Sequence, residues 1–551
     1  MSKESKCQAL AVVLLVLHGF VDASTEKPNV LLLIADDLRP ALGIYGEPVL
    51  SPNIDQLGEQ SVVFTRAYAQ QALCGPSRTS FLTSRRPDST HLYDFYSYWR
   101  TAAGNFTSLP QYFKEHGYYA ASFGKVFHPG IASGRHCDMP YSWSEPCYIA
   151  PTQQYKNAKV CPGRDGKLHK NLLCPVDVKK QPGGSLPDIE IADAAMEFIK
   201  KKRPKDKPFF LAVGFHKPHI PLKFPEEFLD LYPLSSIKPV PDPDLPSGLP
   251  QIAWNPWTDI REREDIAALN LTFPYAKMPL EYQMKIRQHY YAATSYMDSL
   301  VGKVLQTLDK EGLANNTVIA FTGDHGWAMG EHQEWSKYSN FEVSTRVPLI
   351  VSVPWLTHAK YQERTYPFID VLSNSTRFNL DEYNIGKGKF TDKLAELVDL
   401  FPTLVEVAGL PKIPECPVNS SQMTTCTEGL SLSPLLKHNN GRHVAWKKAV
   451  FSQYPRPSLY PQDDSDKPRL KHIKYMGYTM RTDRYRYIEW VSFNHKHFKP
   501  HWHQVHGKEL YDYEFDSLEM NNQVNVSSYS NVVKKLSHLL RKGWHNALPD
   551  R

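Results

Sequence analysis

The chain has 551 residues and a mass of 63.0 kDa, with 41% hydrophobic, 12% aromatic and 22% charged residues. This composition excludes a disordered, collagen-like or coiled-coil protein and predicts a folded chain of two or three domains. The formal net charge of +6 leaves 22 histidines uncounted. Anionic partners are therefore favoured, most strongly in mildly acidic solution.

The first 23 residues have the pattern of a secretory signal peptide. Lys3 and Lys6 precede an apolar stretch over residues 9–20, and the small side chain of Ala23 suits cleavage. This stretch is shorter than the roughly 20 residues needed to cross a bilayer, and no later segment approaches that length. We therefore expect a mature protein that has no membrane span. An uncleaved signal anchor is the alternative.

The cysteines and the glycosylation motifs both fit an oxidising secretory route. Six cysteines lie in neighbouring pairs at spacings typical of short disulfides, and no C-x-x-C motif supports zinc binding as the alternative. The expected pairs are Cys137 with Cys147, Cys161 with Cys174, and Cys416 with Cys426. Cys74 is left without a partner. Six N-x-S/T sequons predict surface glycans, at Asn105, Asn270, Asn315, Asn374, Asn419 and Asn525.

Short apolar runs alternate with helical patterns along the chain, which predicts an α/β fold. The runs have the length of strands that are buried in a largely parallel sheet, and they cover residues 29–34, 118–123, 208–215, 317–322 and 347–353. One amphipathic helix is expected over about 281–313, with its apolar stripe in the core. Another is expected over 185–203, opening with Ser185 and Asp188 as a capping pair. The proline-rich stretch over 216–256 is too long for a simple crossover and predicts one wall of a cleft.

The last quarter of the chain has a different pattern. A polar stretch over 437–442 predicts a boundary between a large domain, 24–437, and a smaller C-terminal subdomain, 438–551. Beyond it, residues 476–490 alternate like an antiparallel hairpin, and residues 532–548 predict a terminal helix. We therefore expect a large, mostly parallel sheet flanked by helices, followed by a C-terminal α+β subdomain built on an antiparallel sheet.

Polar clusters follow four of the expected strands. They are Asp36 with Asp37, Lys125 with His128, His216 with His219, and Asp324 with His325. Each cluster alone is compatible with a surface turn, but ligands bind at the carboxyl ends of strands in open α/β sheets, so the repetition indicates one site. Three carboxylates brought together repel one another unless a cation neutralises them. Their oxygens suit Ca²⁺ or Mg²⁺, while His325 leaves Zn²⁺ or Mn²⁺ open.

The unpaired Cys74 lies in the string Cys-Gly-Pro-Ser-Arg, before a helical pattern that has Pro76 near its start. A helix N-terminus together with Arg78 favours a bound anion. On its own, Cys74 is compatible with a buried free thiol. The string, however, matches the C-x-P-S-R signature of the type I sulfatases, in which this cysteine is oxidised to formylglycine in the endoplasmic reticulum. Four further segments resemble family motifs, so that the resemblance covers nearly the whole chain: 29–37, 51–55, 124–128 and 323–326.

The resemblance implies a sulfuric ester hydrolase of the sulfatase and alkaline phosphatase-like fold, in which residues 24–437 form the catalytic domain. It implies one Ca²⁺ ion and a formylglycine nucleophile that the formylglycine-generating enzyme makes from Cys74. The implied Ca²⁺ ligands are Asp36, Asp37, the modified Cys74, Asp324 and His325. The implied cations facing the sulfate are Arg78, Lys125 and Lys337, and the implied proton donors and acceptors are His128 and His219. Two positions depart from the family: His325, where Asn is more common, and Ser84, where Gly is usual and conversion of Cys74 is expected to be less efficient.

Some segments resemble one branch of the family more closely, namely 36–40, 93–95, 124–130, 216–221 and 452–457. This branch removes the 2-sulfate of L-iduronate from heparan sulfate and dermatan sulfate in the lysosome. The resemblance implies sulfated glycosaminoglycan oligosaccharides as partners, no nucleic acid, and a lysosomal destination. It also implies that Lys467 contacts the uronate carboxylate, while Trp327 and Tyr338 shape the sugar pocket. The alternatives are a sulfatase for another sugar, a phosphodiesterase or phosphonate hydrolase of the same superfold, and a non-catalytic glycan-binding protein.

Overall fold

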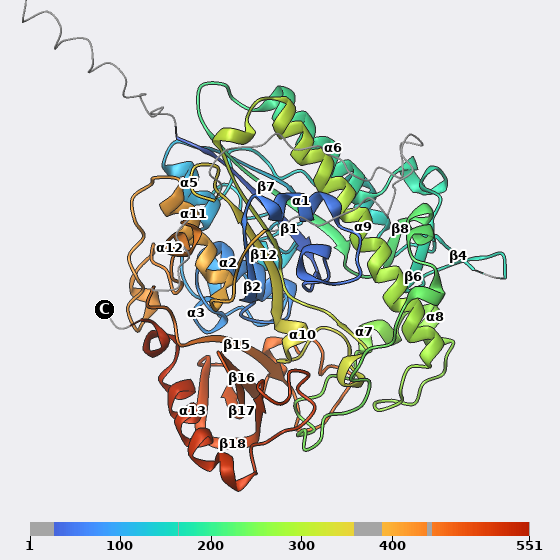
Figure 1. Ribbon diagram of the computed structural model, residues 1–551, viewed down its shortest axis with the longest axis vertical. Helices are drawn as coiled ribbons and strands as arrows, with labels where there is room; N and C mark the ends of the chain where they lie inside the picture. The colour runs from blue at the N-terminus through green and yellow to red at the C-terminus, as the bar shows by residue number, and fades with distance from the viewer. Residues whose placement is uncertain (1–26, 164, 358–387, 438–443, 550–551) are drawn as a thin grey trace, which may run out of the picture.

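A central sheet of eight strands organises the computed structural model, which describes residues 27–163, 165–357, 388–437 and 444–549 (Figure 1). The strand order is β13-β2-β12-β9-β1-β7-β3, and β14 also pairs with β2. The strands are β1 (Asn29–Asp36), β2 (Val62–Tyr68), β3 (Tyr119–Gly124), β7 (Phe209–Pro218), β9 (Thr317–Gly323), β12 (Arg346–Ser352), β13 (Lys389–Thr391) and β14 (Ala395–Glu396). The expected signal peptide and the sequon at Asn374 lie outside the described residues.

The five strands predicted from the sequence are all present, as β1, β3, β7, β9 and β12. The sheet is largely parallel, but β12 runs antiparallel to both β2 and β9. A strand that is buried on both faces shows the same continuous apolar run in either direction, so the pattern could not reveal this. Strand β2 was not predicted, because Thr65 and Arg66 interrupt its apolar run and are only partly buried.

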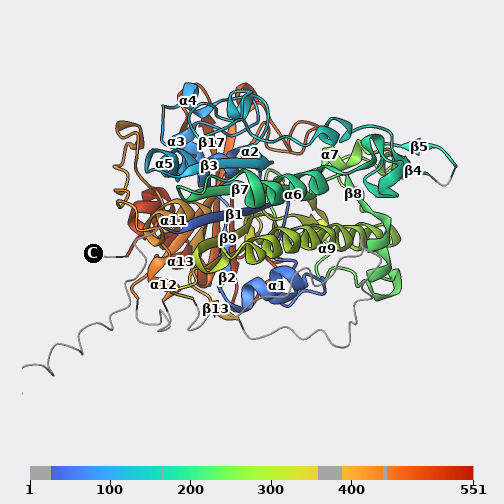
Figure 2. The ribbon, with the colours of Figure 1, turned by 90° about the horizontal axis from the view of Figure 1, so that it is seen from above.

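Both faces of the sheet are covered by helices. Leu31 and Leu33 of β1 belong to the core on one face, with residues of α1 (Pro52–Glu59), α6 (Pro187–Glu197) and α9 (Leu280–Lys310). Leu32 and Ile34 belong to the core on the other face, with residues of α2 (Cys74–Thr83), α5 (Leu109–Glu115) and α11 (Leu400–Val407). This double burial explains why β1 has no alternation of polar residues. Figure 2 shows α6 and α9 lying side by side along the sheet.

The two predicted helices are present, but the expected capping pair is wrong. The first, α6, begins at Pro187 with Leu186 as its N-cap and continues as a π-helical turn over Phe198–Lys202. The carboxylate of Asp188 instead accepts hydrogen bonds from the backbone N–H groups of His216 (2.8 Å) and Lys217 (2.9 Å). Asp188 therefore binds residues that are distant in the sequence and does not cap the helix, as the local pattern predicted it would. It ties α6 to the end of β7.

The C-terminal part forms the expected antiparallel sheet, with four strands in the order β15-β16-β17-β18. They are β15 (Ala449–Arg456), β16 (Tyr475–Thr482), β17 (Tyr485–Asn494) and β18 (Lys499–Asp512), with α13 (Ser530–Lys542) packed against them. The predicted hairpin is β16–β17, and the predicted terminal helix is α13. In Figure 1 this sheet is orange to red and lies below the larger one. Residues 438–443, at the expected boundary, lie outside the described residues, so the division into two domains stays a prediction.

Shorter elements connect these parts. The helices are α3 (Pro87–Thr90), α4 (Trp99–Ala102), α7 (Thr258–Arg261), α8 (Glu264–Ala267), α10 (Glu342–Thr345) and α12 (Ser433–Leu436). The strand pairs are β4 (Cys161–Pro162) with β5 (Leu168–His169), β6 (Leu173–Val176) with β8 (Leu222–Pro225), and β10 (Ala328–Met329) with β11 (Trp335–Ser336). The end of the proline-rich segment contacts a predicted site residue. The side chain of Asn255 donates a hydrogen bond to the backbone carbonyl oxygen of Lys337 (2.8 Å).

The disulfides and the glycosylation motifs expected of a secreted chain can be located in the structure. The structure contains the three expected disulfides, Cys137–Cys147, Cys161–Cys174 and Cys416–Cys426, and Cys74 is a buried free thiol. The sequon asparagines within the described residues are all exposed, at positions 105, 270, 315, 419 and 525. Within the described ranges, no helix combines the length and the apolarity that spanning a bilayer requires.

One buried carboxylate holds α1 against α9. Asp298 of α9 accepts from the backbone N–H groups of Asn53 (3.2 Å) and Ile54 (2.8 Å) and from the Asn53 side chain (2.7 Å). We expect Asp298→Ala to leave these buried donors unpaired and to destabilise the protein by about 2–4 kcal/mol, seen as a lower urea midpoint. Lys310→Ala, at the exposed end of the same helix, serves as the control. Equal midpoints for the two variants would contradict the role of Asp298.

Candidate active site

The polar clusters predicted at the strand ends meet at one edge of the sheet. Asp36 is the last residue of β1. Strand β9 pairs with β1 and is followed by Asp324. Strand β7 pairs with the other edge of β1 and ends within the His216–His219 segment. Lys125 follows β3, where its backbone passes over Gly214. A Cβ atom at Gly214 would lie 2.0 Å from the Lys125 carbonyl oxygen, so only glycine permits this approach. The parallel register therefore brings together groups that are up to 288 positions apart in sequence, as the interval from Asp36 to Asp324 shows.

Cys74 lies at the centre of these groups. It is the first residue of α2, and its Sγ atom is 3.2 Å from Lys337 Nζ, 3.4 Å from His325 Nε2 and 3.9 Å from Asp37 Oδ1. Its side chain is buried, and burial raises the pKa of the thiol to about 12. Cys74 is thus in contact with one member of each predicted pair: Asp37 of the pair Asp36 and Asp37, and His325 of the pair Asp324 and His325.

The donor set around Cys74 fits a divalent cation. Ligand atoms of Asp36, Cys74, Asp324 and His325 lie within 4.8 Å of one another, and so do those of Asp36, Asp37, Cys74 and His219. Asp36 Oδ1 and Asp37 Oδ2 are buried carboxylate oxygens to which no described residue donates a hydrogen bond. Buried acceptors without a donor are costly unless another positive group reaches them. Carboxylate oxygens in this number suit a hard divalent ion.

Three buried cations balance the three carboxylates. Lys125 Nζ pairs with Asp36, Lys337 Nζ lies 2.5 Å from Asp37 Oδ1, and Arg78 Nε lies 2.8 Å from Asp324 Oδ2. Burial opposes the charge of Asp36, but Lys125 and the cations beside it outweigh burial and hold the pKa of Asp36 well below its usual range. For Asp37 the balance is reversed, and burial raises the pKa despite Lys337.

Arg78 contacts the acidic groups of the site. Its guanidinium binds Asp324, lies 3.3 Å from Asp36 Oδ1, and donates to the carbonyl oxygens of Lys125 and Val126. The side chain is fully buried. Arg78 therefore neutralises the acidic groups and fixes their positions, and its part in neutralising a sulfate stays a prediction.

The two predicted proton-transfer histidines follow different strands of the sheet, His128 after β3 and His219 after β7. His219 Nε2 lies 3.9 Å from Asp37 Oδ2, and its Nδ1 lies 2.5 Å from the carbonyl oxygen of Ile220, an arrangement that makes Nδ1 the donor. His128 stacks on Phe95 with ring centres 4.3 Å apart. Burial lowers the pKa of both imidazoles well below the usual value, with the nearby lysines adding to the effect. Both rings are neutral at neutral pH and can accept a proton.

Trp327 does not line a sugar pocket. Its side chain is fully buried and stacks on Tyr290 of α9, with ring centres 5.2 Å apart. The Tyr290 hydroxyl donates to the Asp37 carbonyl oxygen (2.7 Å) and accepts from the Arg39 N–H (3.2 Å). Trp327 therefore supports the residue that fixes the backbone of Asp37, which has a positive φ of 62°. Sequence reasoning placed Tyr290 in the core stripe of its helix and missed the hydroxyl.

The other two predicted substrate residues lie side by side next to Lys337. Lys467 Nζ is 5.6 Å from the Tyr338 ring centre and 4.0 Å from Asp259 Oδ2, and its side chain is 38% exposed. The Tyr338 hydroxyl donates to the same Asp259 oxygen (2.5 Å). Lys467 is thus an accessible cation at the margin of a buried site, where a ligand anion can replace Asp259 as its partner.

The departure at Ser84 has a structural account. Ser84 caps the end of α2 with a φ of 52°, the left-handed region that favours glycine. Its hydroxyl lies 2.5 Å from the carbonyl oxygen of Val398 and 2.7 Å from the Thr427 hydroxyl. These hydrogen bonds offset the strain of the serine backbone. The efficiency of Cys74 conversion stays a prediction.

Comparison with known proteins places this site in a family. The sulfatase family model matches residues 28–410. The chain belongs to the sulfatase family. This sulfatase is 50% identical to the iduronate 2-sulfatase of Homo sapiens and 49% identical to that of Mus musculus, each time over 94% of both chains. The phosphonate monoester hydrolase of Agrobacterium radiobacter has the same fold, with a TM-score of 0.64 and 20% identity over 94% of this chain and 95% of its own. The protein is therefore a sulfuric ester hydrolase, and its family implies a formylglycine and a divalent metal.

The hydroxyl of Tyr290 gives a test of how the site is held. We expect Tyr290→Phe to free the Asp37 backbone and to weaken the binding of a divalent cation by about 10- to 100-fold, as loss of a group behind a metal ligand does. Binding is measured as the rise in melting temperature with added Ca²⁺, which needs no activity. Tyr291→Phe is the matched control, because the neighbouring hydroxyl contacts Arg287 instead. The same loss in both variants would contradict the role of Tyr290.

Proposed function

We propose that this sulfatase hydrolyses the 2-sulfate ester of L-iduronate residues in heparan sulfate and dermatan sulfate. The observation that carries the sulfatase chemistry is the free Cys74 in contact with the acidic and basic groups of the site. The choice of iduronate 2-sulfate rests on half identity over nearly the full length to the human and mouse enzymes of that name. A sulfatase for another sugar is the second candidate, because the phosphonate hydrolase shows that the fold alone does not select the ester.

The groups implied by the family fit the residues that surround Cys74. Asp36, Asp37, Asp324 and His325 would hold one Ca²⁺ ion beside a formylglycine made from Cys74 by the formylglycine-generating enzyme. When present, the formylglycine hydrate supplies a nucleophilic hydroxyl and a second hydroxyl for sulfate release, and the cation supplies positive charge beside them. With formylglycine in place of the Cys74 thiol, the donors of this proposed set are all oxygens except that of His325, which supports Ca²⁺ over a softer metal.

The side chains of the protein provide charge compensation and proton transfer. A sulfate monoester is anionic, so Lys125 and Lys337 lower the cost of bringing a nucleophile to it. His219 first accepts a proton at Nε2 and then gives it to the leaving sugar oxygen, while His128 takes the proton that must be removed for sulfate release. Arg78 keeps Asp36 and Asp324 in position. Lys467 binds the uronate carboxylate beside Tyr338, which accounts for an accessible cation at the edge of the site.

The disulfides and the expected signal peptide support a route through the secretory pathway to the lysosome. Three disulfides form in an oxidising compartment. Residues 1–23 are proposed as the signal peptide, residues 24–437 as the catalytic domain and residues 438–551 as the C-terminal subdomain. We propose sulfated glycosaminoglycan oligosaccharides as the substrates met there.

The modification of Cys74 is tested by mass spectrometry. The tryptic peptide 67–78 of the protein from a secreting eukaryotic host should be about 18 Da lighter than the unmodified sequence, because formylglycine has replaced Cys. Cys74→Ala should lower the rate by about 10⁴-fold or more. An unmodified thiol in a fully active protein would refute the proposed chemistry.

The substrate is tested at Lys467. Lys467→Ala should lower kcat/KM by about tenfold or more for a disaccharide that carries iduronate 2-sulfate, because a charge-assisted contact is lost. It should change the hydrolysis of a neutral aryl sulfate by less than about threefold, because that substrate has no carboxylate. Lys471→Ala, an exposed lysine of the same connection, is the control. Equal losses on both substrates would withdraw the carboxylate contact and favour another sugar sulfate.

A further inference from the structure

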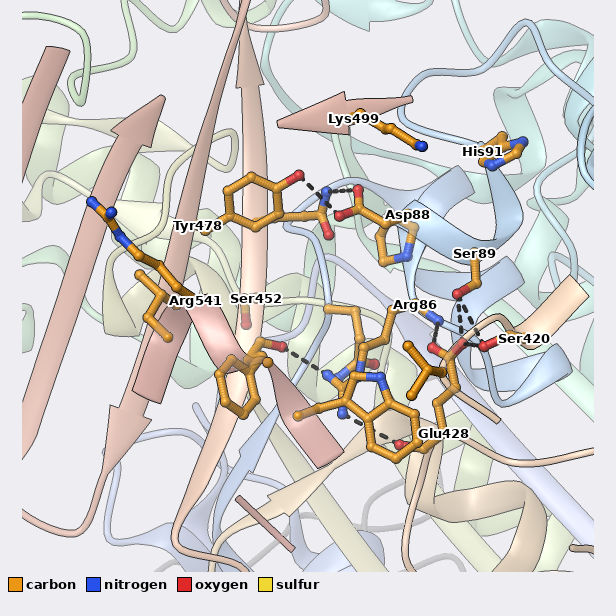
Figure 3. Close-up of a pocket in the computed structure, with 18 of the residues that line it drawn as sticks. Arg86, Asp88, Ser89, His91, Ser420, Glu428, Ser452, Tyr478, Lys499 and Arg541 are labelled. Atoms are coloured by element: carbon orange, nitrogen blue, oxygen red, sulfur yellow. Dashed lines mark hydrogen bonds between the residues drawn. The ribbon is translucent and has the colours of Figure 1, made fainter. Parts of the chain in front are cut away.

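A cavity of about 520 Å³, apart from the active site, lies between the C-terminal sheet and the segment that follows α2 (Figure 3). None of the residues discussed above for catalysis or substrate binding lines it. Its walls come from α3, the segment 418–428, β15, β16, the start of β18 with the residues before it, and the end of α13. The volume is in the range of sites that bind small molecules or a few sugar units. We name this space the interface cavity.

The acidic side chains of the interface cavity are already satisfied by the protein. Asp88 accepts from the hydroxyls of Tyr93 and Tyr478, both at 2.9 Å, and from the Gln453 side chain at 2.8 Å. Glu428 accepts from the Arg86 N–H (2.7 Å) and from the Ser89 hydroxyl (2.5 Å). Figure 3 shows the hydrogen bond from Tyr478 to Asp88 and those from Ser89 and Ser420 to Glu428. Neither acid is left open to bind a cation.

The hydrogen-bonding groups that remain open in the interface cavity are mainly donors. In the described part of the chain, nothing pairs with the side chains of Lys499 and His497, which are exposed at its edge. Arg86 is not among these open donors, because it is 8% exposed, its terminal nitrogens bind Glu396 and its Nε atom is buried without an acceptor. One buried acceptor, Gln70 Oε1, also has no donor. This combination suits a ligand that has anionic oxygens and a few hydroxyls.

Aromatic side chains form the apolar part of the interface cavity. Trp502 and Trp544 line it together with Phe451 and Tyr478. Trp502 packs on Tyr478 with ring centres 4.9 Å apart. Flat aromatic faces beside a few polar groups are typical of sites that bind a rigid ligand. The C–H face of a sugar ring matches such a surface.

Two segments beside the interface cavity are basic, although two of their cations, Lys508 and Arg541, pair with the buried Glu489 of β17. Residues 493–508 and 530–548 flank the cavity and contain no Asp or Glu, but together they contain seven Lys or Arg and seven His. The formal charge of the whole chain is +6, so the rest of the chain has a net charge of −1. The two segments are in contact, because Arg541 of α13 lies over Trp502 at 5.8 Å. Such a surface attracts polyanions.

We propose that the interface cavity is a second binding site for a sulfated glycan chain, with a sulfate at Lys499 and a sugar ring against the tryptophans. The identity of the glycan rests on the proposed function, since the active site acts on the same polymer. Binding in the cavity does not depend on turnover. A sulfated glycan fits better than a membrane surface, because a flat bilayer cannot enter a cavity of this size.

The test uses a heparin octasaccharide from which the 2-sulfates have been removed, so that the active site finds no scissile ester. The probe should bind the full-length protein, as measured by calorimetry. Lys499→Glu should weaken binding by about tenfold, whereas Lys535→Glu on the exposed face of α13 should weaken it by less than about threefold. Hydrogen exchange should slow in peptides spanning 495–503 and 540–545. Hydrolysis of a small aryl sulfate should be unchanged in Lys499→Glu.

Several outcomes would overturn the proposal. Equal losses for the two charge reversals would mean that the surface attracts polyanions without using the cavity. Binding to phosphatidylserine vesicles but not to the octasaccharide would assign the surface to membranes. Binding that appears only in Asn419→Gln would mean that the glycan of this rim asparagine fills the cavity. If instead the octasaccharide binds as expected but a disaccharide that carries iduronate 2-sulfate is not hydrolysed, the proposed function fails and the binding site stands.

Discussion

The balance of buried charge around Cys74 is the constraint on which the rest of this structure depends. Asp36, Asp37 and Asp324 are fully buried, and burying a carboxylate is costly unless a cation accompanies it. The protein supplies Arg78, Lys125 and Lys337, so that the formal charges of the six groups cancel. A divalent cation would add two positive charges to this set, and the loaded site would attract an anionic ester. The same balance explains why strands β1, β3 and β9 must end at one edge of the sheet.

Much of this site could be predicted from the sequence because its geometry follows from strand ends. An apolar run followed at once by Asp36 or Asp324 specifies both a strand and the edge at which the side chain lies. The contact of Cys74 with these groups was implied by its signature, because the unpaired cysteine alone was also compatible with a buried free thiol. Lys337 had no such signal. It lies between Ser336 and Tyr338, which both have positive φ values, and only the family resemblance pointed to it.

The misinterpreted residues share a physical cause, which is that a local pattern does not show which distant group a side chain will meet. Asp188 has the sequence position of a helix cap, yet it binds the backbone at the end of β7. Trp327 is of a residue type that often contacts sugars, yet it stacks against Tyr290 in the core. Tyr290 fits an apolar stripe because its ring is buried, while its hydroxyl holds Asp37. Contacts between elements decided all three cases.

The C-terminal sheet is part of the site rather than an appendage to it. Gln453 of β15 donates from its backbone to Gln70 (2.9 Å), four residues before Cys74. Arg456, at the end of the same strand, is buried and donates to the carbonyl oxygens of Ile252 (3.0 Å) and Tyr338 (2.7 Å). The larger sheet therefore supplies the reacting groups, while β15 fixes the loops around them. Lys467 lies in the connection that follows β15. Because one fold can carry different activities, we expect selection of the ester to depend on such connections more than on the sheet.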